Sequence, residues 1–153
     1  MKISHSITLI MLAAVATILI FAGRAFAQEY LGKYSNNPYA ADSTSNPYGT
    51  YGSPYNSRSI NNSYGRYGSP YSAESTKNPN ATSAPKLYDG NGNYRGRLST
   101  NPYSPDSVAN PYGRYGNKYS PDSINNPYGV GNPYRSDSPQ NPYGKGLNIV
   151  GDE

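Results

Sequence analysis

The chain has 153 residues and a formal net charge of +4, with thirteen Lys and Arg against nine Asp and Glu. It contains no cysteine, which excludes disulfides and thiol chemistry. Tyrosine dominates its aromatic content, with eighteen residues against two phenylalanines and no tryptophan.

The N-terminal segment, 1–27, has the features of a secretory signal peptide. Lys2 gives a positive start, residues 7–22 are apolar and uncharged, and Ala25, Phe26 and Ala27 form the small-x-small pattern that precedes cleavage. We predict cleavage between Ala27 and Gln28. The alternative is a retained anchor, but the sixteen apolar residues would span only about 24 Å of a hydrocarbon layer about 30 Å thick. The mature chain is therefore expected to be periplasmic or secreted, and to meet a membrane only through the signal peptide.

Residues 28–153 lack His, Cys, Met, Trp and Phe altogether. Catalysis by Cys–His or Ser–His–Asp arrangements is therefore excluded there, and we expect neither an enzyme nor a cofactor. An enzyme using paired carboxylates would require two repeat carboxylates in one pocket. Without Lys2 and Arg24 the net charge is only +2 and the basic residues stand singly, so nucleic acid is not an expected partner.

Leucine, isoleucine and valine together number only ten in residues 28–153. Such low aliphatic content is typical of disordered chains, although the high net charge that usually accompanies disorder is missing. We expect that an ordinary aliphatic core cannot form, and that any order depends on tyrosine, whose ring can bury on the order of 150 Å².

A repeat organises the sequence. Asn-Pro-Tyr occurs seven times and Ser-Pro-Tyr twice, and the marker tyrosines alternate between steps of nine and seven residues, so the unit is sixteen residues long. A longer shift, of sixty-four positions, superposes residues 46–49 on residues 110–113, which predicts a tandem duplication. The marker tyrosines are Tyr39, Tyr48, Tyr55, Tyr64, Tyr71, Tyr103, Tyr112, Tyr119, Tyr128, Tyr134 and Tyr143.

Each part of the unit predicts a local structure. Asn-Pro-Tyr-Gly has the chemistry of a type I turn. Ser120-Pro121-Asp122-Ser123 predicts a single helical or 3₁₀ turn, because Ser is a common N-cap, Pro suits the first helical position and Asp favours the positive end. The next Asn-Pro then stops the helix, so long helices are excluded.

Strands are expected at four places only. Residues 86–88 and 93–98 flank Asp89-Gly90-Asn91-Gly92, which is a hairpin signal. Residues 30–34 and the apolar run 147–150 complete one small antiparallel sheet, at which the two repeat halves begin and end. The predicted fold class is therefore an irregular, turn-rich tandem repeat with this sheet and single helical turns, with partial disorder as the alternative. The predicted divisions are 1–27 signal peptide, 28–83 first repeat half, 84–98 hairpin, 99–145 second repeat half, and 146–153 C-terminal strand and tail.

Residues 30–32, 84–89 and 93–96, together with the Asn-Pro-Tyr-Gly units, resemble a group of small exported bacterial proteins of unknown function. The resemblance covers essentially the whole mature chain. It implies a bacterial envelope or secreted setting and brings no activity with it.

The carboxylates have two interpretations. Five of them recur at one place in the repeat, and we expect them to cap single helical turns rather than form an acid ladder or calcium row. These are Asp42, Glu74, Asp106, Asp122 and Asp137. Residues 89–93 begin like a calcium loop, but Tyr94 occupies the position that needs glycine and Thr100 the position that needs glutamate, so a hairpin turn is expected and no metal.

The marker tyrosines also have two interpretations. They are either packing residues that hold the repeat together or an exposed surface that stacks on sugars, peptidoglycan or a partner chain. The favoured function is a non-enzymatic, structural or binding protein of the envelope or the outside of the cell, with cell-wall glycan or its own copies as partners. The alternative is a disordered, self-associating tyrosine-rich polymer.

Overall fold

The computed structural model describes residues 28–152, so the expected signal peptide and Glu153 lie outside the described residues. The described residues contain one four-stranded antiparallel sheet and no helix, which confirms the predicted sheet. Its strands are β1 (Glu29–Tyr34), β2 (Lys86–Tyr88), β3 (Tyr94–Arg97) and β4 (Leu147–Gly151), in the order β1-β4-β2-β3.

The last strand holds the sheet together. β4 pairs with β1 along one edge and with β2 along the other, and β3 joins only through the hairpin with β2. Leu147 and Ile149 of β4 are fully buried, as is Leu87 of β2, whereas Asn148 and Val150, which alternate with them along β4, are only partly covered. This alternation follows from the two-residue period of a strand and gives the sheet one core face.

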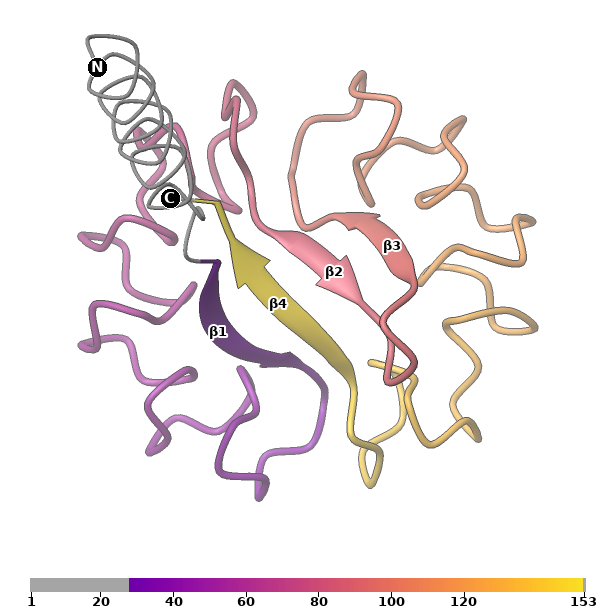
Figure 1. Ribbon diagram of the computed structural model, residues 1–153, viewed down its shortest axis with the longest axis horizontal. Helices are drawn as coiled ribbons and strands as arrows, with labels where there is room; N and C mark the ends of the chain where they lie inside the picture. The colour runs from indigo at the N-terminus through magenta and orange to yellow at the C-terminus, as the bar shows by residue number, and fades with distance from the viewer. Residues whose placement is uncertain (1–27, 153) are drawn as a thin grey trace, which may run out of the picture.

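Two arms surround the sheet (Figure 1). The first arm, residues 35–85, leaves β1 and returns through β2, and the second arm, residues 98–146, leaves β3 and returns through β4. Figure 1 shows the arms curving around opposite sides of the sheet as successive loops, so that the whole forms a disc.

The arms consist of consecutive tight turns. In the second arm, Ser123 N–H donates to the Ser120 carbonyl at 3.2 Å, Asn126 N–H donates to Ser123 at 3.3 Å, and Gly129 N–H donates to Asn126 at 3.1 Å. Each turn thus ends where the next begins, without the overlapping bonds that make a helix. The segment at residues 120–123 is therefore a β-turn closed by the single bond that a 3₁₀ turn would have, and no α-helical turn is found there.

Between the arms and the sheet lies a small aliphatic core. Nine of the ten aliphatic residues of the mature chain are buried, and they form one cluster with Tyr67. These are Leu31, Ile60, Leu87, Leu98, Val108, Ile124, Val130, Leu147 and Ile149. The expectation that an aliphatic core cannot form is wrong, because nearly every aliphatic side chain is directed to one place.

Buried serines line the inner side of the arms. Ser43, Ser59 and Ser75 in the first arm and Ser107 and Ser123 in the second are spaced sixteen residues apart and have no exposed surface. The Ser107 hydroxyl donates to the Ser99 carbonyl at 3.0 Å and accepts a bond from the Ala109 N–H at 3.1 Å. The hydroxyl therefore replaces water for two backbone groups inside the fold.

Two glycines let the arms approach the sheet. Gly32, at an irregularity in the pairing of β1 with β4, has φ +85°, and a Cβ atom there would lie 2.5 Å from Cβ of Tyr51. Gly96 of β3 has φ +92°, and its Cβ would lie 2.7 Å from that of Tyr115. Both positions therefore need glycine for its backbone and for the space that it leaves.

Candidate functional site

The Asn-Pro-Tyr-Gly turn determines where its tyrosine points. Asn46 Oδ1 accepts a bond from the Tyr48 N–H at 3.0 Å, and the Asn46 carbonyl accepts one from the Gly49 N–H at 3.1 Å. Asn46 Nδ2 donates to the Ala40 carbonyl at 3.1 Å, which ties the turn to the preceding one. These bonds match the predicted type I turn, in which the tyrosine is the second corner residue. At that corner the side chain projects away from the chain.

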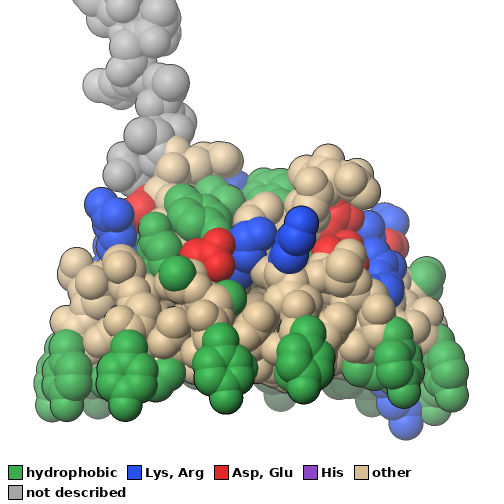
Figure 2. All heavy atoms as spheres, turned by 90° about the horizontal axis from the view of Figure 1, so that it is seen from below, with side chains coloured by type: hydrophobic (Ala, Val, Ile, Leu, Met, Phe, Trp, Pro, Cys, Tyr) green, Lys and Arg blue, Asp and Glu red, His purple; other side chains and the backbone are tan. Residues whose placement is uncertain are grey.

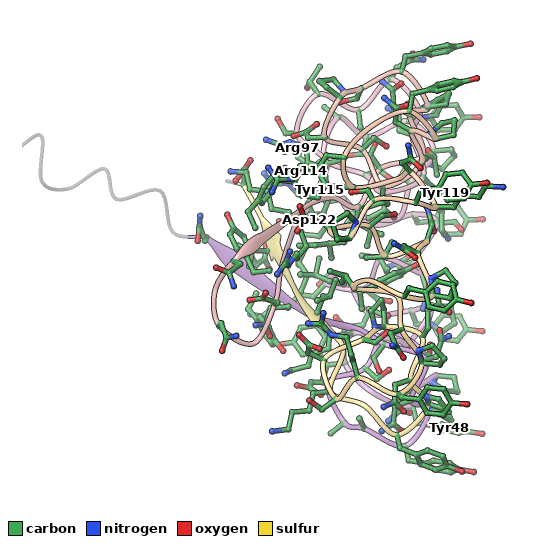
Figure 3. The ribbon with its side chains drawn as sticks, turned by 90° about the vertical axis from the view of Figure 1, so that its right-hand side faces the viewer. Tyr48, Arg97, Arg114, Tyr115, Tyr119 and Asp122 are labelled. Carbon is green, nitrogen blue, oxygen red and sulfur yellow. The ribbon has the colours of Figure 1, made fainter. Side chains whose placement is uncertain are left out.

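All eleven marker tyrosines project in this way and form what we call the tyrosine crown. Each ring is between 77% and 99% exposed. Figure 2 shows the rings standing side by side along one face, with most of the charged side chains nearer the opposite face. In Figure 3 Tyr48 and Tyr119 point to the side away from the sheet. The crown residues are Tyr39, Tyr48, Tyr55, Tyr64, Tyr71, Tyr103, Tyr112, Tyr119, Tyr128, Tyr134 and Tyr143.

All eleven tyrosines that the repeat marks lie on the surface. The interpretation of the marker tyrosines as packing residues is wrong, because exposed rings bury almost no area. Their spacing follows the turns, whose backbone and Asn bonds hold the arms without them.

A second group of tyrosines lies on the sheet side. Tyr51 and Tyr115 follow crown tyrosines by three residues, and each meets a strand tyrosine edge to face, Tyr30 at 5.4 Å and Tyr94 at 5.3 Å between ring centroids. The two contacts are related by the same shift that superposes residues 46–49 on residues 110–113. That shift also relates two isolated bridges, Lys33 with Ser43 and Arg97 with Ser107. Edge-to-face pairs of this kind stabilise packing beyond the area that they bury.

Three phenols donate to carboxylates, two from these strand tyrosines and one from Tyr67 of the core cluster. The Tyr30 hydroxyl donates to Asp42 at 3.2 Å, that of Tyr67 to Glu29 at 2.7 Å, and that of Tyr94 to Asp106 at 2.9 Å. Burial, and after it the neighbouring carboxylate, raises the pKa of all three tyrosines well above the usual range. These phenols therefore stay protonated, and their hydrogen bonds to the carboxylates stabilise the fold.

The repeat carboxylates do not cap helical turns, since the described residues contain none. They accept hydrogen bonds from side chains instead. Asp122, for example, forms ion pairs with Arg95 and with Arg114, both at 2.6 Å. Asp137 pairs with Arg135 at 2.9 Å in the same way, and Glu74 pairs with Arg66 at 3.3 Å. The capping interpretation is therefore wrong, and no group of three or more metal-ligating side chains occurs between residues 28 and 152.

The predicted hairpin turn at residues 89–93 is confirmed. Asp89 N–H donates to the Asn93 carbonyl at 3.0 Å, and Asp89 Oδ1 accepts bonds from the N–H groups of Asn91 and Asn93. Its Oδ2 binds Arg95 at 2.8 Å. Burial alone would raise the pKa of Asp89, but bonds from Asn93 and Arg95 lower it to about 2. The carboxylate is therefore a structural anion that ties the hairpin together.

Three hollows of the surface are large enough to hold part of a ligand. One, of about 420 Å³, lies between the arms and is lined by Ile60 and Val108 together with Thr76, Lys77 and Thr100. A second, of about 400 Å³, lies between the crown rings Tyr55 and Tyr64, and a third, of about 490 Å³, lies in the second arm beside Asn125 and Pro127. None of the three is lined by a carboxylate, so these hollows do not meet the requirement for paired carboxylates in one pocket.

Sequence reasoning missed the buried serine row, although a signal for it exists. A serine precedes the inward residue of each unit, which is aliphatic in Ser59-Ile60, Ser107-Val108 and Ser123-Ile124 and a buried threonine after Ser43 and Ser75. A serine followed by one aliphatic residue or threonine, repeated every sixteen residues, marks the inward edge of a turn.

Among residues 28–152 no helix is long and apolar enough to cross a membrane. Comparison with protein-family models, with curated proteins and with solved structures finds no match to this chain.

Proposed function

We propose that the protein is an exported, non-enzymatic binding protein of the bacterial envelope, whose tyrosine crown stacks on cell-wall glycan. The observation that carries the proposal is the gathering of eleven exposed rings on one face of a hydrogen-bonded scaffold. A tyrosine ring offers an apolar face and a hydroxyl at once, which matches the C–H faces and hydroxyls of a sugar.

The setting of this proposal rests on the predicted signal peptide and on the resemblance to exported bacterial proteins. The absence of His and Cys from residues 28–153 supports a role in binding rather than catalysis. We also propose that the arms are copies of one ancestral arm, because their tyrosine contacts and bridges recur at one constant shift along the chain.

A pull-down with purified peptidoglycan tests the glycan proposal. We expect the wild-type chain, residues 28–153, to sediment with the glycan, and a variant with Tyr39, Tyr48, Tyr55, Tyr64 and Tyr71 changed to Ser to sediment several-fold less. The control variant changes the exposed cations Lys77 and Lys145 to Ser, which should leave sedimentation nearly unchanged if the rings bind. Retention no better than that of an unrelated protein of equal charge would refute glycan binding.

Self-association through the crown is the second candidate, and the size of the exposed aromatic face favours it. Monomeric proteins rarely leave large apolar patches uncovered. Sedimentation velocity over a range of concentrations separates the two: growth into larger species that the five-serine variant abolishes would support self-association. Narrowly dispersed amide signals in an NMR spectrum would instead support the disordered polymer.

A further inference from the structure

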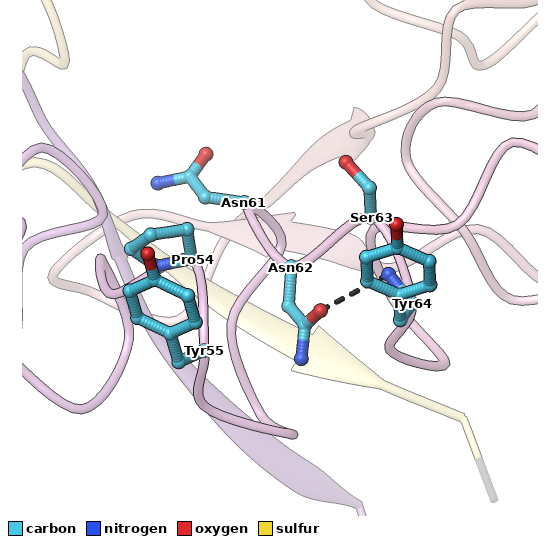
Figure 4. A pocket seen from close by; sticks show the side chains of 6 residues that line it. All are labelled: Pro54, Tyr55, Asn61, Asn62, Ser63 and Tyr64. Carbon is cyan, nitrogen blue, oxygen red and sulfur yellow. Dashed lines mark hydrogen bonds between the residues drawn. The ribbon is translucent and has the colours of Figure 1, made fainter.

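The hollow between Tyr55 and Tyr64 has a polar floor between two crown rings (Figure 4). Its volume is about 400 Å³, and its lining consists of Pro54, Tyr55, Asn61, Asn62, Ser63 and Tyr64. Figure 4 shows the two rings standing on either side of Asn62.

The floor is preorganised. Asn62 Oδ1 accepts a bond from the Tyr64 N–H at 3.0 Å, and its Nδ2 donates to the Asn56 carbonyl at 3.1 Å. Asn61 is fixed by Nδ2 bonds to the carbonyls of Thr44 and Gly52. The exposed Ser63 hydroxyl has no hydrogen-bond partner among the described residues, so it can donate to a ligand.

The corresponding place in the second arm has the same floor, because Asn126 and Asn125 make the same bonds there, but it differs at two other positions. When residues 46–49 are superposed on residues 110–113, Lys118 stands where the first arm has Pro54, and Pro127 stands where it has Ser63. Lys118 Nζ lies 4.9 Å from the ring centroid of Tyr119, which is 77% exposed against 91% for Tyr55. The lysine thus covers a ring face that the first arm leaves open, and the proline replaces the hydroxyl.

We infer that the hollow between Tyr55 and Tyr64 is a subsite for one pyranose ring of a glycan, and that the second arm has no equivalent. This inference rests on the proposed function and names the residues at which one sugar of the glycan binds. The electron-rich ring faces attract the C–H groups of a pyranose. The hydroxyls of Ser63, Tyr55 and Tyr64 are available to the sugar hydroxyls.

NMR titration of residues 28–153 with a soluble β-1,4-linked N-acetylglucosamine tetrasaccharide tests the subsite. We expect amide shifts to concentrate at residues 53–64, with the equivalent residues 117–128 unaffected. Tyr55→Ala should weaken binding by about tenfold, and the matched Tyr119→Ala should not change it.

The arms supply variants that exchange the site between them. Pro54→Lys with Ser63→Pro gives the first arm the residues of the second, and we expect the shifts at residues 53–64 to disappear while the spectrum stays folded. Lys118→Pro with Pro127→Ser should produce new shifts at residues 117–128. Each exchanged residue already occurs at that position of the other arm, so both variants should fold.

Several results would overturn the subsite. They are shifts spread evenly over both arms, binding unchanged by the first-arm exchange, or no binding of the tetrasaccharide at all. The proposed function fails separately, when the wild-type chain does not sediment with peptidoglycan. A third combination is a first-arm exchange variant that still sediments with peptidoglycan while the wild-type chain fails to bind the tetrasaccharide. That result would support the crown as the binding face and refute the subsite.

Discussion

At the scale of single residues, asparagine governs nine of the eleven turns that carry crown tyrosines, and serine takes its place before Tyr55 and Tyr71. Asn126 closes its own turn through its carbonyl, orients Tyr128 through Oδ1 at 2.9 Å, and reaches back through Nδ2 to the Ser120 carbonyl at 2.9 Å. No other side chain of this length offers a donor pair and an acceptor together. The exposure of the crown rings is therefore a consequence of the residue two places before each of them.

Asp89 is the residue whose charge contributes most clearly to stability. Its pKa of about 2 in the folded chain lies below the ordinary value of 3.8. This stabilisation, about 2 kcal/mol, is fully present above the pKa of the unfolded chain and is lost as the pH falls from about 4 to about 2. We expect Asp89→Asn to lower the free energy of unfolding by about that amount at pH 7, measured by urea denaturation.

The difference between Asp89→Asn and wild type should shrink as the pH approaches 2. Asp137→Asn is the control, because Asp137 pairs with Arg135 on the exposed surface and such pairs contribute less than about 1 kcal/mol. An Asp89→Asn variant as stable as wild type at pH 7 would contradict the role assigned to this carboxylate.

At the scale of elements, neighbouring turns are joined by inward-pointing amides. Asn125 Nδ2 donates to the carbonyls of Val108 and Gly116, both at 3.0 Å, and Asn61 makes the same pair of bonds in the first arm at 2.8 and 3.0 Å. In a sheet, such carbonyls would accept hydrogen bonds from a neighbouring strand. Here one asparagine side chain donates hydrogen bonds to the carbonyls of two turns.

Replacing this amide by a carboxyl group tests the junction. Asn125→Asp keeps the shape but removes both donors, and it places an acceptor against two carbonyls. We expect a loss of about 1–3 kcal/mol in the free energy of unfolding, and a similar loss for Asn61→Asp. Asn91→Asp, at the exposed tip of the hairpin, is the matched control. Equal urea midpoints for Asn125→Asp and Asn91→Asp would show that the amide is dispensable.

The sequence predicted the sheet because its signals are local. The Asp89–Gly92 turn and the apolar run at residues 147–150 each mark a strand without reference to the rest of the chain. The core could not be predicted so easily, because the arms contribute only widely spaced, single aliphatic residues such as Ile60 and Ile124. One such residue in sixteen has no helical or strand period, and only the curvature of both arms brings these residues together.

At the scale of the whole molecule, the core and the crown contain different types of hydrophobic residue. Aliphatic residues fill the space between arms and sheet, and the repeat tyrosines stand on the outside. The two groups can therefore change independently, since turns held by backbone and asparagine bonds join them. A scaffold of this kind can alter its exposed face without altering its fold.

This division predicts that removing rings from the crown leaves the fold intact. Each exposed tyrosine should contribute within about 0.5 kcal/mol to the free energy of unfolding, so the variant with five first-arm rings changed to Ser should melt within a few degrees of wild type. Tyr67, the buried tyrosine of the core cluster, is the matched control of the same residue type. Tyr67→Ala should cost about 3 kcal/mol or more, through the lost packing and the cavity that it leaves.

Circular dichroism and differential scanning calorimetry of the two variants measure the contrast. The five-serine variant should keep the unfolding transition of wild type and lose sedimentation with glycan, whereas Tyr67→Ala should lower the transition temperature sharply. The reverse order of stabilities would mean that the rings hold the arms together after all. The crown would then be part of the scaffold rather than a face that the scaffold presents.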